Sequence, residues 1–298
     1  MRAVTAWRIA CAAFGVALRR VGCVAVLIGG ASASGCSGLI GSMAADTLSA
    51  AILDQEDPQL IEEGAPAYLL LLDGFISRNP DDAALLAAGA QLYALYGSRF
   101  AEDSERRIAL TTKARRYGSS AMCRSYQWAC SAELGDYETY REQLSRVTRR
   151  DIDLLYAYAV SWLSHLDATS EDWTAVAELP WVEAALERVL ELDETYSQGA
   201  VHGYLGTLNA LRPPALGGRP EVAQRHFERA IELSGGRDLS VKVEYARRYA
   251  RLVFDQELHD RLLREVLEAP TDAPGLTLFN ALAKEEAEQL LATSEDYF

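Results

Sequence analysis

The residue types that most often perform catalysis are dispersed along this chain. A glycine-rich phosphate loop, a Gly-x-Ser-x-Gly elbow and a Cys/His pair suited to nucleophilic attack are all missing from the sequence. Four histidines are present, without the His-x-x-x-His or Glu-x-x-His spacing that metal ligands on one helix need: His165, His202, His226 and His259. We therefore predict no catalytic residue, no metal site and no cofactor, and we expect a protein that binds other molecules without being an enzyme.

Aromatic rings that carry a polar group are concentrated in the middle of the chain. Such side chains can line an apolar cavity while a hydroxyl or an indole N–H holds the polar end of a ligand. Core packing between helices is the commoner use of these rings and stays open as the alternative. The candidates for ligand or partner binding are Tyr93, Tyr96, Tyr156 and Trp162.

Gly64-Ala65-Pro66 interrupts a stretch that otherwise has helical spacing. A kink there would free backbone groups near Ala67 and shape the wall of a pore or cavity. Asp73, seven residues beyond Pro66, is a further candidate binding residue. Two abutting helices explain the same residues equally well.

Residues 212–218 form an insertion that is longer than a tight turn between paired helices needs. Its two prolines stiffen it, and its two glycines let it bend. A rigid exposed loop would hold a guanidinium ready to bind a partner or an organic carboxylate through two parallel hydrogen bonds. The candidate residues are Arg212, Pro213 and Pro214, and a structural corner that packs Leu216 beneath it is the alternative.

The first 35 residues contain basic side chains, no acid and an apolar run at residues 21–31. That run suits the core of an export signal but is too short to span a bilayer comfortably. Ala33-Ser34-Gly35-Cys36 resembles the lipobox of bacterial lipoproteins, in which the cysteine thiol receives a diacylglyceryl group. We expect residues 1–35 to be removed and Cys36 to carry a lipid anchor; a conventional cleavage after Ala31-Ser32-Ala33 is the alternative.

Two further cysteines lie beyond the predicted anchor. Cys123 and Cys130 are seven residues apart in a region with a helical pattern. In an unbroken helix they would be about 10 Å apart along the axis, which is too far for a disulfide. We predict two small core residues, and a bridge across a break in the helix is the alternative.

The elements that position these residues are predicted to be helices. Apolar residues recur at i, i+4, i+7 and i+8 through most of the chain, without sustained period-two alternation. Asp57-Pro58 predicts a helix start, Asn79-Pro80-Asp81 an end and a new start, and Gly235-Gly236 an end before Asp238 caps the next helix. The fold class is all-α, with about a dozen helices joined by short turns.

A degenerate helix-pair repeat of the tetratricopeptide type runs through these helices. Roughly four such repeats are implied, and they must stack to bury their apolar faces, which creates a concave groove. A generic helical bundle is the alternative. The small Gly206 is expected to let the second helix of its pair approach the first. The clearest unit spans residues 199–235, with His202, Leu205, Gly206 and Asn209 on the first helix and Ala223, Phe227 and Ala230 on the second.

The charge of the chain limits its partners. The formal net charge is -14, from 43 acidic and 29 basic residues. This balance disfavours attraction to nucleic-acid phosphates and anionic lipid headgroups, so we expect no nucleic acid and a neutral, basic or apolar partner. Membrane contact is expected through the lipid anchor alone.

Several strings spread over residues 36–298 are specific enough to compare with a known family. They are 57–58 (DP), 63–74 (EGAPAYLLLLDG), 204–206 (YLG), 212–218 (RPPALGG), 226–236 (HFERAIELSGG), 280–283 (NALA) and 296–298 (DYF). In these strings the chain resembles the T-component family associated with tripartite ATP-independent periplasmic (TRAP) transporters, and the loop 212–218 with the helix after it is the most specific part. The resemblance implies a periplasm-facing lipoprotein with tetratricopeptide-like repeats and apolar ligand cavities. It also implies a homotrimer with a central pore, partnered with a periplasmic solute-binding protein (the P component).

We therefore predict a signal peptide over residues 1–35 and a single α-helical domain over residues 36–298. The expected function is that of an adaptor in TRAP-type solute uptake, with a small apolar or carboxylate ligand in a helical cavity or pore. Ser37 after Cys36 places the anchor in the outer membrane by the enterobacterial sorting rule. The alternative is a scaffold for envelope assembly that binds peptides or proteins in its groove.

Overall fold

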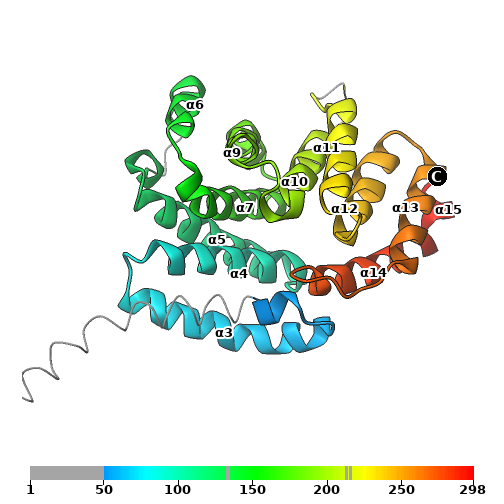
Figure 1. Cartoon of the computed structure of the whole chain (residues 1–298), viewed down its shortest axis with the longest axis horizontal. Coiled ribbons are helices and arrows are strands. Elements are labelled where there is room, and N and C mark those ends of the chain that lie inside the picture. Colours follow the sequence, from blue (N-terminus) through cyan, green and yellow to red (C-terminus); the bar gives the residue numbers. More distant parts are fainter. Residues whose placement is uncertain (1–49, 132–134, 212–213, 215–216) are drawn as a thin grey trace, which may run out of the picture. The chain divides into compact units, whose positions relative to one another are not determined.

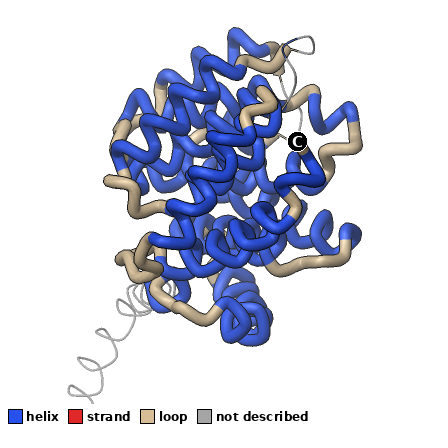
Figure 2. The backbone as a smooth tube through the Cα atoms, turned by 90° about the vertical axis from the view of Figure 1, so that its right-hand side faces the viewer, coloured by secondary structure: helices blue, strands red, loops and turns tan. Residues whose placement is uncertain are grey.

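Every regular element that the structure describes is a helix. The computed structural model describes residues 50–131, 135–211, 214 and 217–298. The predicted signal segment and Cys36 lie outside these residues. Because the described ranges contain helices and no strand, the predicted all-α class is confirmed (Figure 2).

The helices follow one another with short connections. In chain order they are α3 (Pro58–Arg78), α4 (Ala83–Arg99), α5 (Ser104–Cys123), α6 (Tyr137–Ser145), α7 (Ile152–Ala168), α8 (Trp173–Val176), α9 (Leu179–Leu192), α10 (Ala200–Ala210), α11 (Pro220–Leu233), α12 (Leu239–Glu244), the π-helix η5 (Tyr245–Ala250), α13 (Gln256–Glu268), α14 (Thr277–Ala292) and α15 (Ser294–Tyr297). The 3₁₀ turns η1 (Gln127–Cys130), η2 (Arg149–Asp151) and η3 (Tyr196–Gly199) lie between them.

Aspartate side chains begin several helices where the sequence predicts a start. The carboxylate of Asp57 accepts the Leu60 N–H at 3.1 Å, and that of Asp238 accepts the Ser240 N–H at 3.1 Å. Asn79 ends α3, and Asp82 opens α4 by accepting two backbone N–H groups. A side-chain oxygen at this position satisfies backbone donors that have no partner inside the helix.

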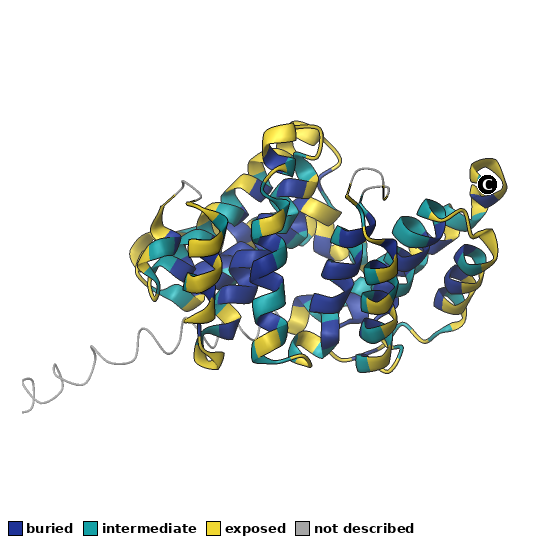
Figure 3. Ribbon diagram, turned by 90° about the horizontal axis from the view of Figure 1, so that it is seen from above, coloured by how far each residue is buried: buried dark blue, intermediate teal, exposed yellow. Residues whose placement is uncertain are grey.

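The helices pack against their neighbours in chain order. α4 contacts α3, α5 and α7, and α9, α10 and α11 follow on the other side of α7 (Figure 1). Figure 3 shows the buried residues on the faces that neighbouring helices share. One apolar core lies around α7 and α9, and a second lies among α11, α12, α13 and α14.

α10 and α11 form the helix pair that the repeat pattern predicts. A Cβ built on Gly206 would lie 2.9 Å from the ring of Phe227. That ring is fully buried and stacks on Tyr245, with 5.0 Å between centroids. The expected role of Gly206 in close helix approach is therefore confirmed.

The last long helix returns to the first. Leu278 of α14 is fully buried in a cluster with Ile61 and Leu69 of α3. The backbone N–H of Gly275, just before α14, donates to the carboxylate of Asp54. The two ends of the described array are therefore in contact, although about 220 residues separate them.

α3 runs without interruption through Pro66. The alternative of two abutting helices at Gly64-Ala65-Pro66 is therefore wrong. Proline has no N–H, so the carbonyl of Glu62, four residues earlier, loses its helical partner. The Tyr96 hydroxyl donates to that carbonyl oxygen at 3.3 Å, which replaces the missing bond.

Cys123 and Cys130 are joined in a disulfide, so the prediction of two unpaired core residues is wrong. α5 ends at Cys123, and the chain turns back through η1. This break brings the two Cα atoms to 4.7 Å, within the range that a disulfide requires. The bridge across a helix break, which was the alternative, is the arrangement found.

No helix of the described ranges is both long enough and apolar enough to cross a membrane.

Candidate functional site

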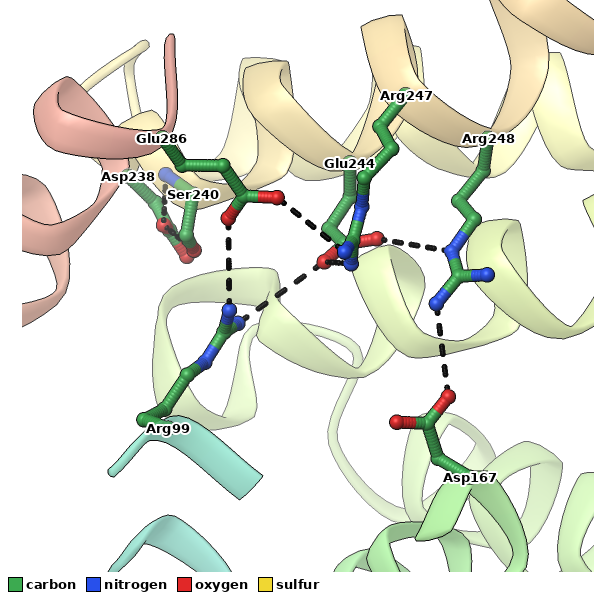
Figure 4. A network of polar contacts seen from close by, with 8 residues as sticks. All are labelled: Arg99, Asp167, Asp238, Ser240, Glu244, Arg247, Arg248 and Glu286. Carbon is green, nitrogen blue, oxygen red and sulfur yellow. Dashed lines mark hydrogen bonds and ion pairs between the residues drawn. The ribbon is translucent and has the colours of Figure 1, made fainter. Parts of the chain in front are cut away.

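Three arginines and three carboxylates from distant parts of the chain meet in one cluster, which we call the central arginine cluster (Figure 4). It is placed by α4, α7, α12, η5 and α14. η5 is a π-helix, a local form that often occurs at functional sites. The members are Arg99, Asp167, Glu244, Arg247, Arg248 and Glu286.

Glu244 lies at the middle of this cluster. Its two carboxylate oxygens contact the guanidinium groups of Arg99 at 4.0 Å and Arg248 at 3.4 Å, and it also pairs with Arg247. Glu286 contacts Arg99 at 3.7 Å and Arg247 at 3.2 Å. Burial raises the pKa of Glu244, but the three guanidinium groups outweigh burial and hold that pKa below its ordinary value.

Two of the arginines keep spare hydrogen-bonding capacity. The contacts of Arg99 and Arg248 measure 3.4 to 4.0 Å, whereas a strong charge-assisted bond measures about 2.7–2.9 Å. The Nε atom of Arg247 is buried and has no acceptor among the described residues. A carboxylate from outside could therefore gain several short hydrogen bonds here.

The space beside the cluster is small in this conformation. A cavity of about 10 Å³ is enclosed by polar and apolar side chains, and it has room for about one water molecule. It is lined by Arg99, Ser240, Val243, Glu244, Phe279, Leu282, Ala283 and Glu286. A larger ligand would have to replace Glu286 or Asp167 as the partner of an arginine.

Tyr156, which is buried, and Tyr204, which is partly buried, form a tyrosine pair near Arg99. The rings of Tyr156 and Tyr204 are 6.4 Å apart. The neighbouring Tyr156 and burial raise the pKa of Tyr204, and the positive charge of Arg99 acts in the opposite direction. Of the predicted aromatic candidates, Tyr156 is linked to the central arginine cluster only through Tyr204, on which the charge of Arg99 acts.

Asp73 and Tyr93 belong to a different group of residues. The Asp73 carboxylate accepts the hydroxyls of Tyr93 at 2.8 Å and Tyr117 at 2.7 Å, and it pairs with Lys113. Burial raises the pKa of Asp73, but the hydrogen bonds and the Lys113 charge together outweigh burial and hold this pKa below its ordinary value. The group ties α3, α4 and α5 together, and all of its polar atoms have partners.

The other predicted residues lie apart from both groups. The Trp162 indole donates to Glu178 at 2.7 Å, and the Arg115 guanidinium lies 4.9 Å from its ring centroid. The Tyr96 hydroxyl donates to the Glu62 carbonyl, which Pro66 leaves without a helical partner. Pro214 is exposed, and Arg212 and Pro213 lie outside the described residues. The predicted residues that the structure describes are therefore not brought into one site.

A larger and more open cleft of about 620 Å³ lies between α3, α4 and α14. Tyr96 and Phe100 contribute aromatic surface, and Glu62, Glu63 and Glu285 contribute negative charge. Carboxylates repel an organic acid, so we do not expect an acidic solute to bind in this cleft.

Two histidines that are dispersed in the sequence meet in the structure. His202 Nδ1 lies 2.8 Å from His226 Nδ1, and His202 Nε2 lies 3.4 Å from Glu194. Burial lowers the pKa of both rings, and that of His226 falls to about 4. Among the described residues, no group of three His, Cys, Asp or Glu side chains could hold a metal ion.

Sequence reasoning missed the central arginine cluster. One local signal is Arg247-Arg248, two charges between Tyr245 and Tyr249 in a stretch whose neighbours are apolar. A charged pair within an apolar stripe costs free energy unless it finds partners, so it points to a buried ion-pair network. Glu244 has the local spacing of a helical ion pair with Arg247 and Arg248. The other partners, Arg99, Asp167 and Glu286, come from three distant helices and leave no trace in local spacing.

The fold and this cluster define a class of protein: an all-α array of paired helices with charged groups on interior faces. The family model of the TRAP transporter T-component matches residues 54–298, and the chain belongs to that family. It is also similar to an uncharacterized protein of Treponema pallidum (strain Nichols), with 24% identity over 267 residues. That similarity covers 82% of this chain and 81% of the relative.

Proposed function

We propose that this chain is the periplasm-facing adaptor of a TRAP-type solute uptake system. In this role it binds the periplasmic solute-binding protein and takes up a small organic acid. Its membership of the T-component family, which is associated with transport, supports the role. The homotrimer that the resemblance implies stays a prediction.

The central arginine cluster is the observation that carries the ligand part of this proposal. Arg99 and Arg248 hold their present partners at long distances, and a ligand carboxylate can take the place of Asp167 or Glu286. The exchange keeps the number of negative charges around the guanidinium groups constant, so it avoids leaving a buried charge unpaired. Phe279 and Leu282 line the cavity beside Arg99 and Glu286 and offer apolar surface to the rest of the solute.

The proposed location is the cell envelope, with Cys36 carrying the lipid anchor and the outer membrane as the expected site. The Cys123–Cys130 disulfide supports this location, because such bonds persist mainly in oxidising compartments outside the cytosol. Mass spectrometry of the mature N-terminus tests the anchor. An unmodified N-terminus that begins elsewhere would contradict it.

The ligand part can be tested with a panel of mono- and dicarboxylates in a thermal-shift assay. We expect an organic acid to raise the melting temperature of the wild type. The same acid should bind Arg248→Gln about 10- to 100-fold more weakly, since a charge-assisted hydrogen bond is lost. Arg264→Gln is the matched control, because Arg264 is exposed on α13 and, among the described residues, pairs with Asp260 of its own helix alone. Equal weakening in both variants would contradict the site.

The partner part needs a TRAP-type periplasmic solute-binding protein from the same organism. We expect the two purified proteins to form a complex that sediments as one species. If they stay separate at micromolar concentrations, with and without the acid, the adaptor role is contradicted whatever the arginines bind.

A further inference from the structure

The open cleft between α3, α4 and α14 has the size of a small-molecule site and a lining of its own character. Its volume of about 620 Å³ lies within the range of about 300–1,000 Å³ that ligand pockets occupy. α3 and α14 contribute carboxylates to it, and the C-terminal end of α4 contributes aromatic rings. Figure 1 shows that these three helices meet where the described array closes on itself.

The carboxylates of this cleft have no cationic partner among the described residues. The side chain of Glu63 accepts the Gln59 amide at 2.8 Å, which is a neutral donor. On α14 the described ion pairs are made by Glu286, whereas Glu285 lines the cleft. Together with Glu62 these side chains bring three negative charges to one cleft. Their field attracts a cation, because charges of one sign that line a cleft add to each other.

A metal ion does not account for these carboxylates. Its oxygen ligands must all lie about 2.0–2.6 Å from one point. Within the described ranges, no three His, Cys, Asp or Glu side chains are arranged to hold a metal ion. The glutamates instead come from two different helices and are spread along the cleft. That arrangement suits a longer cation with charges separated by a chain of atoms.

Apolar surface lies between the carboxylates. The rings of Tyr96 and Phe100 are 5.7 Å apart, and Leu282 lines the same cleft. The Tyr96 ring already attracts a cation of this chain, since the Arg106 guanidinium lies 5.9 Å from its centroid. Such surface can pack against methylene groups, and aromatic rings also attract ammonium groups. The cleft therefore offers negative ends and an apolar middle.

We propose that this cleft binds a small organic polycation, namely an alkyl diamine or polyamine. One ammonium group pairs with Glu62 or Glu63 of α3, and another pairs with Glu285 of α14. The methylene chain between them packs on Phe100 and Leu282. The ligand thus joins α3 to α14, so it stabilises the closure of the array. This site shares no charged residue with the central arginine cluster and takes a ligand of the opposite charge.

Calorimetric titration of the full chain with spermidine, at about 0.15 M salt, tests the proposal. We expect one saturable site per chain, with butylamine binding about 10-fold more weakly because it has a single ammonium group. Glu285→Gln should weaken spermidine binding about 10-fold, since a charge-assisted contact is lost. Glu288→Gln is the matched control: Glu288 is exposed one turn further along α14 and does not line the cleft. Its affinity for spermidine should stay within about twofold of the wild type.

Thermal melting gives a second readout. Spermidine should raise the melting temperature of the wild type and of Glu288→Gln, and should raise that of Glu285→Gln much less. Equal weakening in both variants, or an equal rise with MgCl₂ at the same ionic strength, would show mere screening of an acidic surface and would overturn the proposal. Titration without saturation would do the same. Because both glutamates are exposed, circular dichroism should show folded variants. An organic acid can be titrated into the same proteins, so failure of this site is distinguishable from failure of the arginine site.

Discussion

Gly206, which has no side chain, lets α10 and α11 pack closely. Gly206 faces the Phe227 ring, and Tyr245 supports that ring from behind. The ring therefore has little room to retreat, because buried cores are close-packed.

Gly206→Ala should accordingly destabilise the protein by about 1–2 kcal/mol, because overpacking outweighs the gain in helix propensity. Gly74→Ala is the matched control, since a Cβ there meets nothing within 4 Å among the described residues. The control should be neutral or stabilising by up to about 1 kcal/mol. Denaturant unfolding of both variants measures the difference, and a Gly206→Ala variant as stable as its control would show that the helices can separate freely.

The His202–His226 contact gives the stability a pH dependence. Burial and the neighbouring His202 lower the pKa of His226 from 6.5 to about 4. The folded state therefore prefers the neutral ring, so this contribution to stability is full above pH 6.5 and is lost as pH falls toward 4. In the neutral pair one Nδ1 donates to the other. Protonation of the accepting Nδ1 would place two N–H donors against each other.

We expect the free energy of unfolding of the wild type to fall between pH 6.5 and pH 4. His226→Gln should flatten this decrease, because the amide does not titrate and can still donate to His202. Urea titrations at several pH values measure it. Identical slopes for wild type and variant would show that the pair does not control the pH dependence.

At the scale of elements, the disulfide fixes the turn that follows α5. It closes a loop of eight residues, for which chain entropy predicts a stabilisation of about 2.5 kcal/mol. The double variant Cys123→Ser, Cys130→Ser should lose about this amount in denaturant unfolding. A reducing agent should have the same effect on the wild type and none on the variant. Equal stability of oxidised and reduced wild type would contradict a structural role for the bond.

Local signals in the sequence were sufficient for most helix boundaries. Asp57 and Asp238 are caps, and the periodic apolar positions mark the buried faces, because both effects act within one turn of the chain. The end of α5 was missed because Cys123 is followed by Arg124 and Ser125, without a glycine or proline to mark a stop.

The sites were harder to predict than the helices. Asp73 and Tyr93 were chosen for separate reasons, yet their side chains touch. They do so because α3 and α4 are neighbours in the array, and in a repeat array each unit contacts its neighbours. The central arginine cluster joins Arg99 to Glu286 across the whole array. Such a contact depends on how many helices stack and with what curvature, which single-sequence periodicity does not contain.

At the scale of the whole molecule, the contact between α14 and α3 closes the array. Leu278 carries much of this contact because it is fully buried among side chains of α3 and α4. Leu278→Ala should destabilise the protein by about 2–5 kcal/mol through loss of burial and a residual cavity. Leu70→Ala, on the exposed side of α3, should change stability by less than about 0.5 kcal/mol. Calorimetric melting of both variants would show whether the closure contributes to the stability of the whole array.

The central claim is that an organic acid binds to the arginines inside the helical array. Native mass spectrometry of the protein extracted gently from its own envelope tests it most directly, because one spectrum reports the acyl anchor, the number of copies and any retained solute. We expect a small organic acid on the wild type, and none on Arg99→Gln or Arg248→Gln at the same stoichiometry. A wild-type spectrum without a solute, or an acid retained equally by both variants, would contradict the account.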